Sequence, residues 1–213
     1  SWSNTPSRRI WLAWMNNWHY GQDLPTAPWR SAMTIPRKVG LRVAGGGIRL
    51  VQTPVSELSQ LRGEDFRLDS MALDGDRELS LCGTSLEIEA VFDPGDAAAF
   101  GLVVFQNDQH GTEIGYDRDR REIYVDRTRS GNTDFHPLFS SRTLAPLEVD
   151  SQGLVRLHIF LDRSSVEVFA NEGLVSMSNR VFPPRNADKI TVFTREGKAR
   201  LVSLRAWTMR SAW

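Results

Sequence analysis

The sequence predicts an all-β protein whose larger part is a two-sheet β-sandwich. Apolar and polar residues alternate with a period of two along most of the 213 residues, and helical patterning is nearly absent. Roughly ten short runs of this kind are separated by turn signals at the spacing typical of sandwiches. No apolar run reaches the roughly 20 residues that a spanning helix needs, so we expect no membrane partner.

The first fifty residues are predicted to hold strands and a long loop. Residues 10–15 are apolar on both faces, as in a buried strand, and residues 29–35 place alternate side chains on one side. Residues 21–28 lie between them, contain two prolines and predict a loop, which is the usual location of ligand contacts. Residues 39–43 and 48–52 flank three glycines and predict a hairpin.

A short helix is predicted over residues 54–62, where Val55, Leu58 and Leu61 share one face behind an initial proline. Strands follow one another regularly beyond this helix. They are predicted over residues 86–92, 100–106, 112–117, 121–127, 155–161, 165–170, 189–194 and 199–209. We therefore divide the chain into residues 1–45, a linker with the helix over residues 46–62, and a sandwich over residues 63–213.

Composition excludes several classes of partner. Lysine plus arginine and aspartate plus glutamate are both 26, so no net charge favours nucleic acid or an anionic membrane. Cys82 is the single cysteine, which excludes an internal disulfide and a cysteine-based metal site. The four histidines are scattered without metal-ligand spacing, so we predict no metal and no cofactor, and His158 is expected on the surface or between the sheets.

The first residues lack the pattern of a signal peptide, and we expect the chain to begin within a longer sequence.

Tryptophan is concentrated near the start of the chain. Five of the seven tryptophans lie within the first 29 residues, among side-chain amides and an arginine. Indole rings stack on the apolar faces of sugars while amides and guanidinium groups bind the hydroxyls, which favours a sugar-binding wall. A tryptophan-rich sheet core is the alternative, and composition alone favours it. Because Trp11 and Trp14 lie on opposite faces of the first predicted strand, we expect at least one of them in a core.

Three stretches of sequence carry a resemblance. The first is Arg-Ile-Trp-Leu-Ala-Trp-Met-Asn-Asn-Trp-His-Tyr-Gly at residues 9–21, continuing to residue 37. The second is Glu-Ile-Gly-Tyr-Asp at residues 113–117, followed by residues 125–131, and the third runs from Leu-Asp-Arg-Ser-Ser at residue 161 to residue 183. Together they resemble the C-terminal part of the β-fructofuranosidases of glycoside hydrolase family 32, which include levanases, exo-inulinases and invertases.

The resemblance implies that residues 1 to about 45 are the last strands of a five-bladed β-propeller, which holds the active site, and that a β-sandwich follows. It implies a fructan or sucrose substrate, an extracellular or periplasmic location, and a missing N-terminal propeller part on the same protein or on a separate chain. A homo-oligomer is a further alternative. A partial blade would expose strand edges and apolar faces that need such a partner.

The catalytic groups of that family are expected outside this chain. Retaining glycosidases use two carboxyl groups about 5 to 5.5 Å apart. The family takes its carboxylates from Trp-Met-Asn-Asp-Pro, Arg-Asp-Pro and Glu-Cys motifs, and none of these occurs here. Residues 14–17 resemble the first motif, but Asn17 is an amide and cannot form a glycosyl ester. We therefore predict no catalytic residue here and no activity from the chain alone.

By resemblance, Trp18 borders the fructose pocket, and Asn17 and Trp14 are weaker substrate-binding candidates. Arg30 and Arg37 are expected either to bind sugar or to pair with an upstream carboxylate.

Other carboxylates have ordinary structural explanations. Asp162 and Glu167 lie five residues apart and could form a pair, but a turn residue and a strand residue are the more natural reading. Glu113 and Asp126 are expected as hairpin charges or as a link to the propeller.

Two alternatives for the sandwich stay open. It could itself bind polysaccharide, although it holds only Trp207 and Trp213 as stacking candidates. It could instead support the propeller or mediate dimers.

Overall fold

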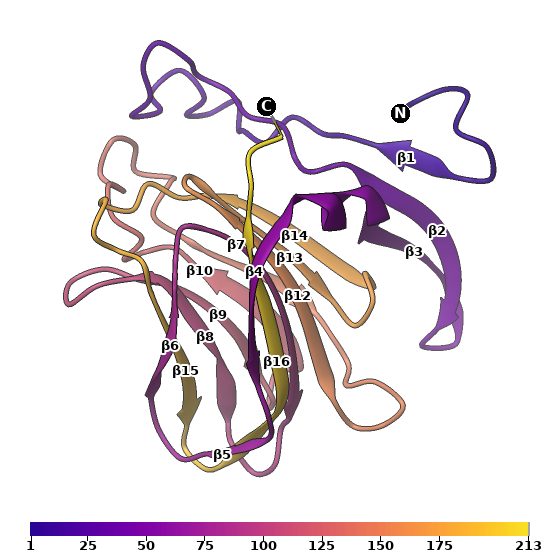
Figure 1. The fold of residues 1–213 in the computed structure, drawn as a ribbon, viewed down its shortest axis with the longest axis vertical. Coiled ribbons are helices and arrows are strands. Elements are labelled where there is room, and N and C mark those ends of the chain that lie inside the picture. The colour runs from indigo at the N-terminus through magenta and orange to yellow at the C-terminus, as the bar shows by residue number, and fades with distance from the viewer. Residues whose placement is uncertain (213) are drawn as a thin grey trace.

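The computed structural model describes residues 1–212, which form two large antiparallel sheets and one small sheet (Figure 1). The seven-stranded sheet has the order β14 (Val175–Arg180), β13 (Ser165–Ala170), β12 (Val155–Asp162), β7 (Ser85–Asp93), β16 (Ala199–Met209) and β4 (Arg62–Leu68), with β5 (Met71–Leu73) also paired to β16. The six-stranded sheet has the order β11 (Arg142–Pro146), β10 (Glu122–Asp126), β9 (Thr112–Asp117), β8 (Ala99–Gln106), β15 (Lys189–Arg195) and β6 (Arg77–Cys82). These two sheets form the predicted sandwich.

The sandwich core follows from the alternation in the sequence. In β7, Leu86, Ile88 and Phe92 are fully buried, as expected for the inward side of the strand. Phe92 packs on Phe100 with ring centroids 5.3 Å apart, and Phe100 packs on Tyr116 at 5.5 Å. Rings from both sheets therefore interlock, and burial of these large side chains is the main stabilising contribution.

Five strands were not predicted: β4, β5, β6, β11 and β14. Four of them, all but β5, are the outermost strands of the two large sheets. Edge strands carry polar side chains that discourage pairing with other chains, and this weakens the alternation on which a prediction depends. The sequence Arg-Glu-Leu-Ser-Leu-Cys of β6 is an example.

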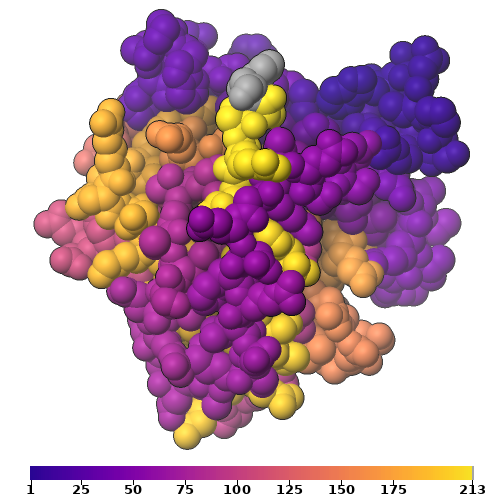
Figure 2. Space-filling view, viewed as in Figure 1, coloured from indigo at the N-terminus to yellow at the C-terminus, as the bar shows by residue number. Residues whose placement is uncertain are grey.

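The N-terminal segment, residues 1–54, forms the small sheet of β1 (Arg9–Trp11), β2 (Arg37–Ala44) and β3 (Gly47–Pro54). The predicted hairpin is confirmed, and Gly45 and Gly46 adopt the positive φ angles of 59° and 76° that its tight turn requires. In Figure 2 this indigo and violet segment forms a lobe over one end of the sandwich. No helix among residues 1–212 is long and apolar enough to cross a membrane.

Two details of the N-terminal predictions are wrong. Residues 29–35 form no strand, and they join the residues after β1 through the isolated bridge between Trp14 and Met33 and through a few single hydrogen bonds. The first strand ends at Trp11, and neither Trp11 nor Trp14 is in a core, because 36% and 39% of their surfaces are exposed. Within residues 1–212 β1 pairs with β2 alone, so the other edge of β1 has no neighbouring strand.

The connection to the sandwich is a 3₁₀-helix, η1 (Ser56–Leu61), where a helix was predicted. The predicted division after residue 45 would cut the β2–β3 hairpin, whose strands pair from Arg37 with Pro54 to Ala44 with Gly47. We therefore propose that the first unit extends to Pro54, and that η1 is the linker.

Candidate functional site

The predicted sugar-binding residues lie in the long connection between β1 and β2, which arches over the end of the sandwich (Figure 1). Trp18 is 90% exposed, and its ring centroid lies 5.0 Å from that of Trp14 at an interplanar angle of 57°. Asn17 is half-buried, and its side-chain oxygen accepts a hydrogen bond from the backbone N–H of His19 at 2.8 Å. The two rings form an open aromatic surface of the kind that stacks on sugars.

Side-chain amides build the turn that presents Trp18. The Asn16 side-chain oxygen accepts from the N–H of Asn17 at 2.9 Å, and its amide nitrogen donates to the carbonyl of Arg30 at 3.1 Å. Among residues 1–212 the side-chain nitrogen of Asn17 has no hydrogen-bond partner, so it is available to a sugar hydroxyl. A Cβ atom on Gly21 would lie 2.8 Å from the Asn17 carbonyl oxygen, so only glycine fits there without a shift of the turn. We call residues 16–23 the Trp18 turn.

The Trp18 turn is attached to the sandwich through an aromatic cluster. Tyr20 is buried against Phe139, and Phe135 and Phe182 complete the cluster with Leu24. Arg127 lies against the same rings. Tyr20 and Arg127 were not singled out from the sequence, although both lie in stretches that carry the family resemblance. The two residues are 107 positions apart, so no pattern of neighbouring residues indicates that they pair.

A buried ion pair makes a second attachment. Arg37, in β2, donates to Glu167, in β13, at 2.5 Å, and both side chains are almost fully buried. Glu167 also accepts from the N–H of Ile35 at 2.8 Å. Burial raises the pKa of Glu167, and the hydrogen bonds from Arg37 and Ile35 oppose this rise. Arg37 thus pairs with a downstream carboxylate rather than with sugar, and Glu167 is not the partner of Asp162.

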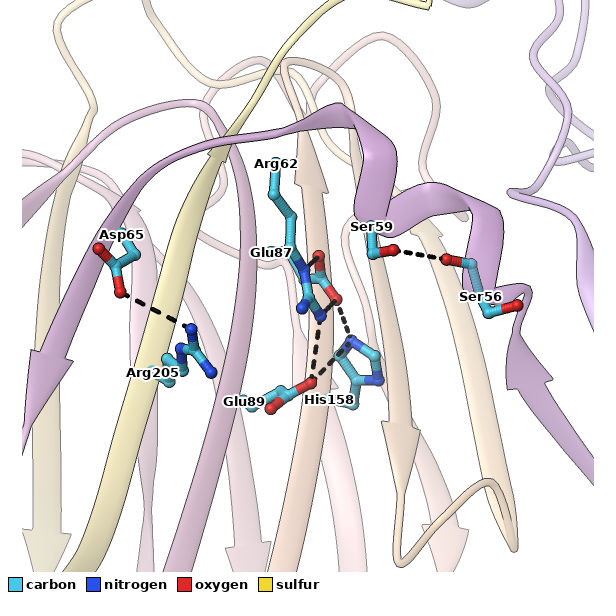
Figure 3. A network of polar contacts seen from close by, with 8 residues as sticks. All are labelled: Ser56, Ser59, Arg62, Asp65, Glu87, Glu89, His158 and Arg205. Atoms are coloured by element: carbon cyan, nitrogen blue, oxygen red, sulfur yellow. Dashed lines mark hydrogen bonds and ion pairs between the residues drawn. The ribbon is translucent and has the colours of Figure 1, made fainter.

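Three potential metal ligands meet on the outer face of the seven-stranded sheet (Figure 3). Ligand atoms of Glu87, Glu89 and His158 lie within 4.8 Å of one another. Arg62 already fills the site, since it donates to Glu87 at 2.7 and 2.6 Å, while the His158 ring lies 2.7 Å from the same carboxylate. Burial opposes ionisation of Glu87, but the hydrogen bonds from Arg62 and His158 lower its pKa to about 2. The Arg62 guanidinium thus supplies the positive charge that a bound metal ion would bring, and the three residues fit an ion-pair network rather than a metal site.

The remaining predicted carboxylates are engaged within the sandwich. Glu113 accepts a hydrogen bond from the Tyr124 hydroxyl, and Asp126 pairs with Arg142 at 2.9 Å. The interpretation as hairpin charges is therefore correct for both residues. Neither Glu113 nor Asp126 contacts the N-terminal segment through these bonds.

Stacking surfaces are absent from the described sandwich. Trp207 is 4% exposed and lies between the guanidinium groups of Arg62 and Arg205, which are 3.6 and 4.4 Å from its ring. Within residues 63–212 every phenylalanine, tyrosine and tryptophan is buried or half-buried. Trp213 lies outside the described residues.

A cleft of about 1000 Å³ separates the tip of the β2–β3 hairpin from the loop at residues 146–152. Ion pairs line it: Arg42 with Glu172 at 2.6 Å and Arg156 with Asp150 at 2.7 Å. It contains no aromatic side chain, so it lacks a platform for a sugar ring.

Comparison with known protein families matches both parts of the chain. Residues 57–208 match the family described as Glycosyl hydrolases family 32 C terminal, and residues 1–54 match the Glycosyl hydrolases family 32 N-terminal domain. The boundary between the two matches falls at η1, immediately after the β2–β3 hairpin.

Individual relatives match the chain from end to end. It is 40% identical over 222 residues to the levanase of Bacillus subtilis, covering 100% of this chain and 33% of the relative. It is 34% identical to an extracellular exo-inulinase of Aspergillus awamori, over 96% of this chain and 39% of the relative. The chain therefore spans between a third and two fifths of the length of these relatives.

Solved structures agree on the fold. The crystal structure of exo-inulinase from Aspergillus awamori superposes with a TM-score of 0.89 at 32% identity, over 96% of this chain and 41% of that one. A β-fructofuranosidase from Schwanniomyces occidentalis superposes with a TM-score of 0.80 at 22% identity, over 95% and 45% of the two chains, which supports the fold alone. The predicted all-β class, a sandwich preceded by the last propeller strands, is confirmed.

Proposed function

This chain belongs to glycosyl hydrolase family 32, and we propose that it is the C-terminal part of a fructan-hydrolysing glycosidase. The complete enzyme would release fructose from levan, inulin or sucrose, and these 213 residues would supply part of the substrate pocket and the supporting sandwich. The observation that carries the proposal is the exposed Trp18 against Trp14, in a turn fixed by amide hydrogen bonds. The similarity to levanase along the whole chain supports the same substrate class.

In this proposal Trp18 stacks on the apolar face of a fructose ring, and the side-chain nitrogen of Asn17 donates to a hydroxyl. Trp14 supports the Trp18 ring from behind. Such contacts orient the sugar for carboxylates that lie outside the 213 residues. There an aspartate would attack the anomeric carbon to form a glycosyl ester, while a glutamate protonates the leaving oxygen and later removes a proton from the incoming water.

The N-terminal segment would need the rest of a propeller as its partner. Leu41, Val43, Ile48 and Leu50 lie on one face of the β2–β3 hairpin and are 46 to 77% exposed. Apolar side chains at this density are normally covered by a neighbouring sheet. An extracellular or periplasmic location is proposed with the enzyme, since the Aspergillus awamori relative is named as extracellular. Assembly into a homo-oligomer stays a prediction.

The test compares fructose release from levan, inulin and sucrose by the 213-residue chain and by the complete enzyme. We expect no release by the chain alone, and release by the complete enzyme. In the latter, Trp18→Ala should raise KM about tenfold through the lost stacking contact, and Trp18→Phe should recover part of the loss. Activity of the chain alone would contradict the proposal. Levan binding by the chain that is unchanged in Trp18→Ala would favour a binding module in the sandwich.

A further inference from the structure

Trp18 receives little support from its own neighbours. Its ring is 90% exposed, and within residues 1–212 its ring contact is with Trp14, which is itself 39% exposed. A stacking platform binds best when its orientation is fixed before the ligand arrives, because ordering a side chain on binding costs affinity. The orientation of Trp18 therefore depends on whatever holds the backbone of the Trp18 turn.

Tyr20 attaches that turn to the sandwich. It lies two residues after Trp18 and is 7% exposed. Its ring packs edge-on against Phe139 at 5.5 Å and against Phe135 at 6.4 Å, and both phenylalanines belong to the loop between β10 and β11. The Tyr20 carbonyl also accepts from the N–H of Asp23 at 3.0 Å, so the position of Tyr20 sets the far side of the turn as well.

Arg127 holds the Tyr20 hydroxyl. This arginine directly follows β10, is 6% exposed, and donates to the Tyr20 oxygen at 3.1 Å. It also donates to the Ser141 hydroxyl at 3.2 and 3.3 Å and to the Arg180 carbonyl at 3.3 Å, and it lies 4.3 Å from the Phe139 ring. All these acceptors are neutral, and among residues 1–212 no carboxylate pairs with Arg127. A buried guanidinium without a counter-ion depends strongly on each acceptor it has, and hydrogen bonds from an ionised donor are about twice as strong as neutral ones.

We propose that Arg127 is a positioning residue for Trp18 and that it acts through the hydroxyl of Tyr20. The sandwich thereby sets the geometry of an aromatic surface that belongs to the N-terminal segment. That this surface binds fructose rests on the proposed function, whereas the positioning itself does not.

The positioning is measurable in the chain without substrate. Two indoles that are close and tilted to each other, as Trp14 and Trp18 are, give an exciton couplet in far-ultraviolet circular dichroism, and Trp18→Ala identifies that signal. Tyr20→Phe removes a single oxygen atom and should lower the couplet amplitude by about half or more, because the turn loses its hydrogen bond. Tyr116→Phe is the matched control: it removes a buried hydroxyl that donates to the Leu147 carbonyl at 3.0 Å inside the sandwich, and should leave the couplet intact.

Two arginine variants test the other partner. Arg127→Met should weaken the couplet as Tyr20→Phe does, and Arg127→Lys, which keeps a charged donor, should restore part of it. Each spectrum is recorded where the sandwich is folded, judged by protection of the core strands from amide exchange. A full couplet in Tyr20→Phe would overturn the proposal even if Arg127→Met fails to fold.

The complete enzyme separates this proposal from the proposed function. Tyr20→Phe should raise KM for levan about threefold to tenfold and change kcat less than about twofold, because only ground-state positioning is lost. If Trp18→Ala leaves KM unchanged, the proposed function fails, while the circular dichroism result on positioning stands. If Trp18→Ala raises KM but Tyr20→Phe changes neither KM nor the couplet, the positioning role is wrong, while the proposed role of Trp18 in substrate binding stands.

Discussion

Removal of Arg37 should destabilise the protein by an amount that depends on pH. Arg37→Met leaves the 3% exposed Glu167 without its counter-ion, and the N–H of Ile35, at 2.8 Å, and the Ser178 side chain remain to stabilise its charge. The variant also loses the hydrogen bonds from Arg37 to Gln52 at 3.0 Å and to Ser178 at 2.5 Å. Breaking a buried pair by removing one partner typically costs about 3–5 kcal/mol, because an uncompensated charge remains. For a chain of this size, a loss of 3 kcal/mol lowers Tm by about 6–12 °C.

The direction of the pH dependence follows from the pKa of Glu167. Burial already raises this pKa with Arg37 present, and removal of Arg37 raises it further. A raised pKa means that the folded state favours the protonated carboxyl, so the contribution of Glu167 to stability is most favourable at low pH and is lost as pH rises through its folded-state pKa. The deficit of Arg37→Met should therefore be largest near neutral pH and shrink on acidification. At low pH the remaining deficit should be about 1–2 kcal/mol, which reflects only the hydrogen bonds that the variant lacks.

Urea unfolding followed by tryptophan fluorescence measures this deficit. Five of the seven tryptophans lie in the first 29 residues, so the signal reports mainly on the N-terminal segment. Arg42→Met is the matched control: Arg42 also lies in β2 and also pairs with a sandwich glutamate, Glu172, but that carboxylate is 72% exposed. Its loss should cost at most about 1 kcal/mol. Arg37→Met combined with Glu167→Leu should recover most of the stability. A deficit equal at about pH 8 and about pH 5, or no larger than that of Arg42→Met, would refute the reasoning.

Two further predictions concern acid stability and the Trp18 turn. The pKa of Glu87 is lowered to about 2 from an ordinary value of 4.5, so its contribution of about 3 kcal/mol is present above pH 4.5 and lost as pH falls toward 2. In an acid titration, Glu87→Gln should therefore lose less stability over this range than the parent protein does. The Glu89 side chain is half exposed, so Glu89→Gln should follow the parent protein. Gly21→Ala places a Cβ atom 2.8 Å from the Asn17 carbonyl oxygen and should weaken the tryptophan couplet while the sandwich stays folded. Gly47→Ala meets no atom within 4 Å, and a couplet lost equally in both variants would contradict the steric explanation.

Local patterns predicted the central strands well and the edges poorly. In β7 the alternation of Leu86, Ile88 and Phe92 with glutamates placed the inward face correctly. Glu87, on the opposite face, is nevertheless only 2% exposed. Arg62 and His158 cover it, and because both come from other strands, the pattern within β7 could not indicate this burial. Exposure of an outward side chain depends on what packs over the sheet, and that information is not local.

The same limit applies to the candidate site. The density of tryptophan near residue 18 left a sugar-binding wall and a sheet core as alternatives, and in the structure Trp18 is open to solvent beside Trp14. The choice between core and surface for Trp11 required the tertiary structure, because a strand that is apolar on both faces is buried only where neighbours cover both faces.

The sequence by itself determined the all-β class, the hairpin around residues 45–47 and the family, because these depend on short-range periodicity, on turn chemistry and on motifs that are continuous in the chain. Only the tertiary structure decided how the N-terminal segment is held. Arg37 meets Glu167 across 130 residues and Tyr20 meets Arg127 across 107. With 26 basic and 26 acidic side chains in the chain, charge alone allows many pairings. Sheet register and burial select among them, since a charge removed from water must find its partner within hydrogen-bonding distance.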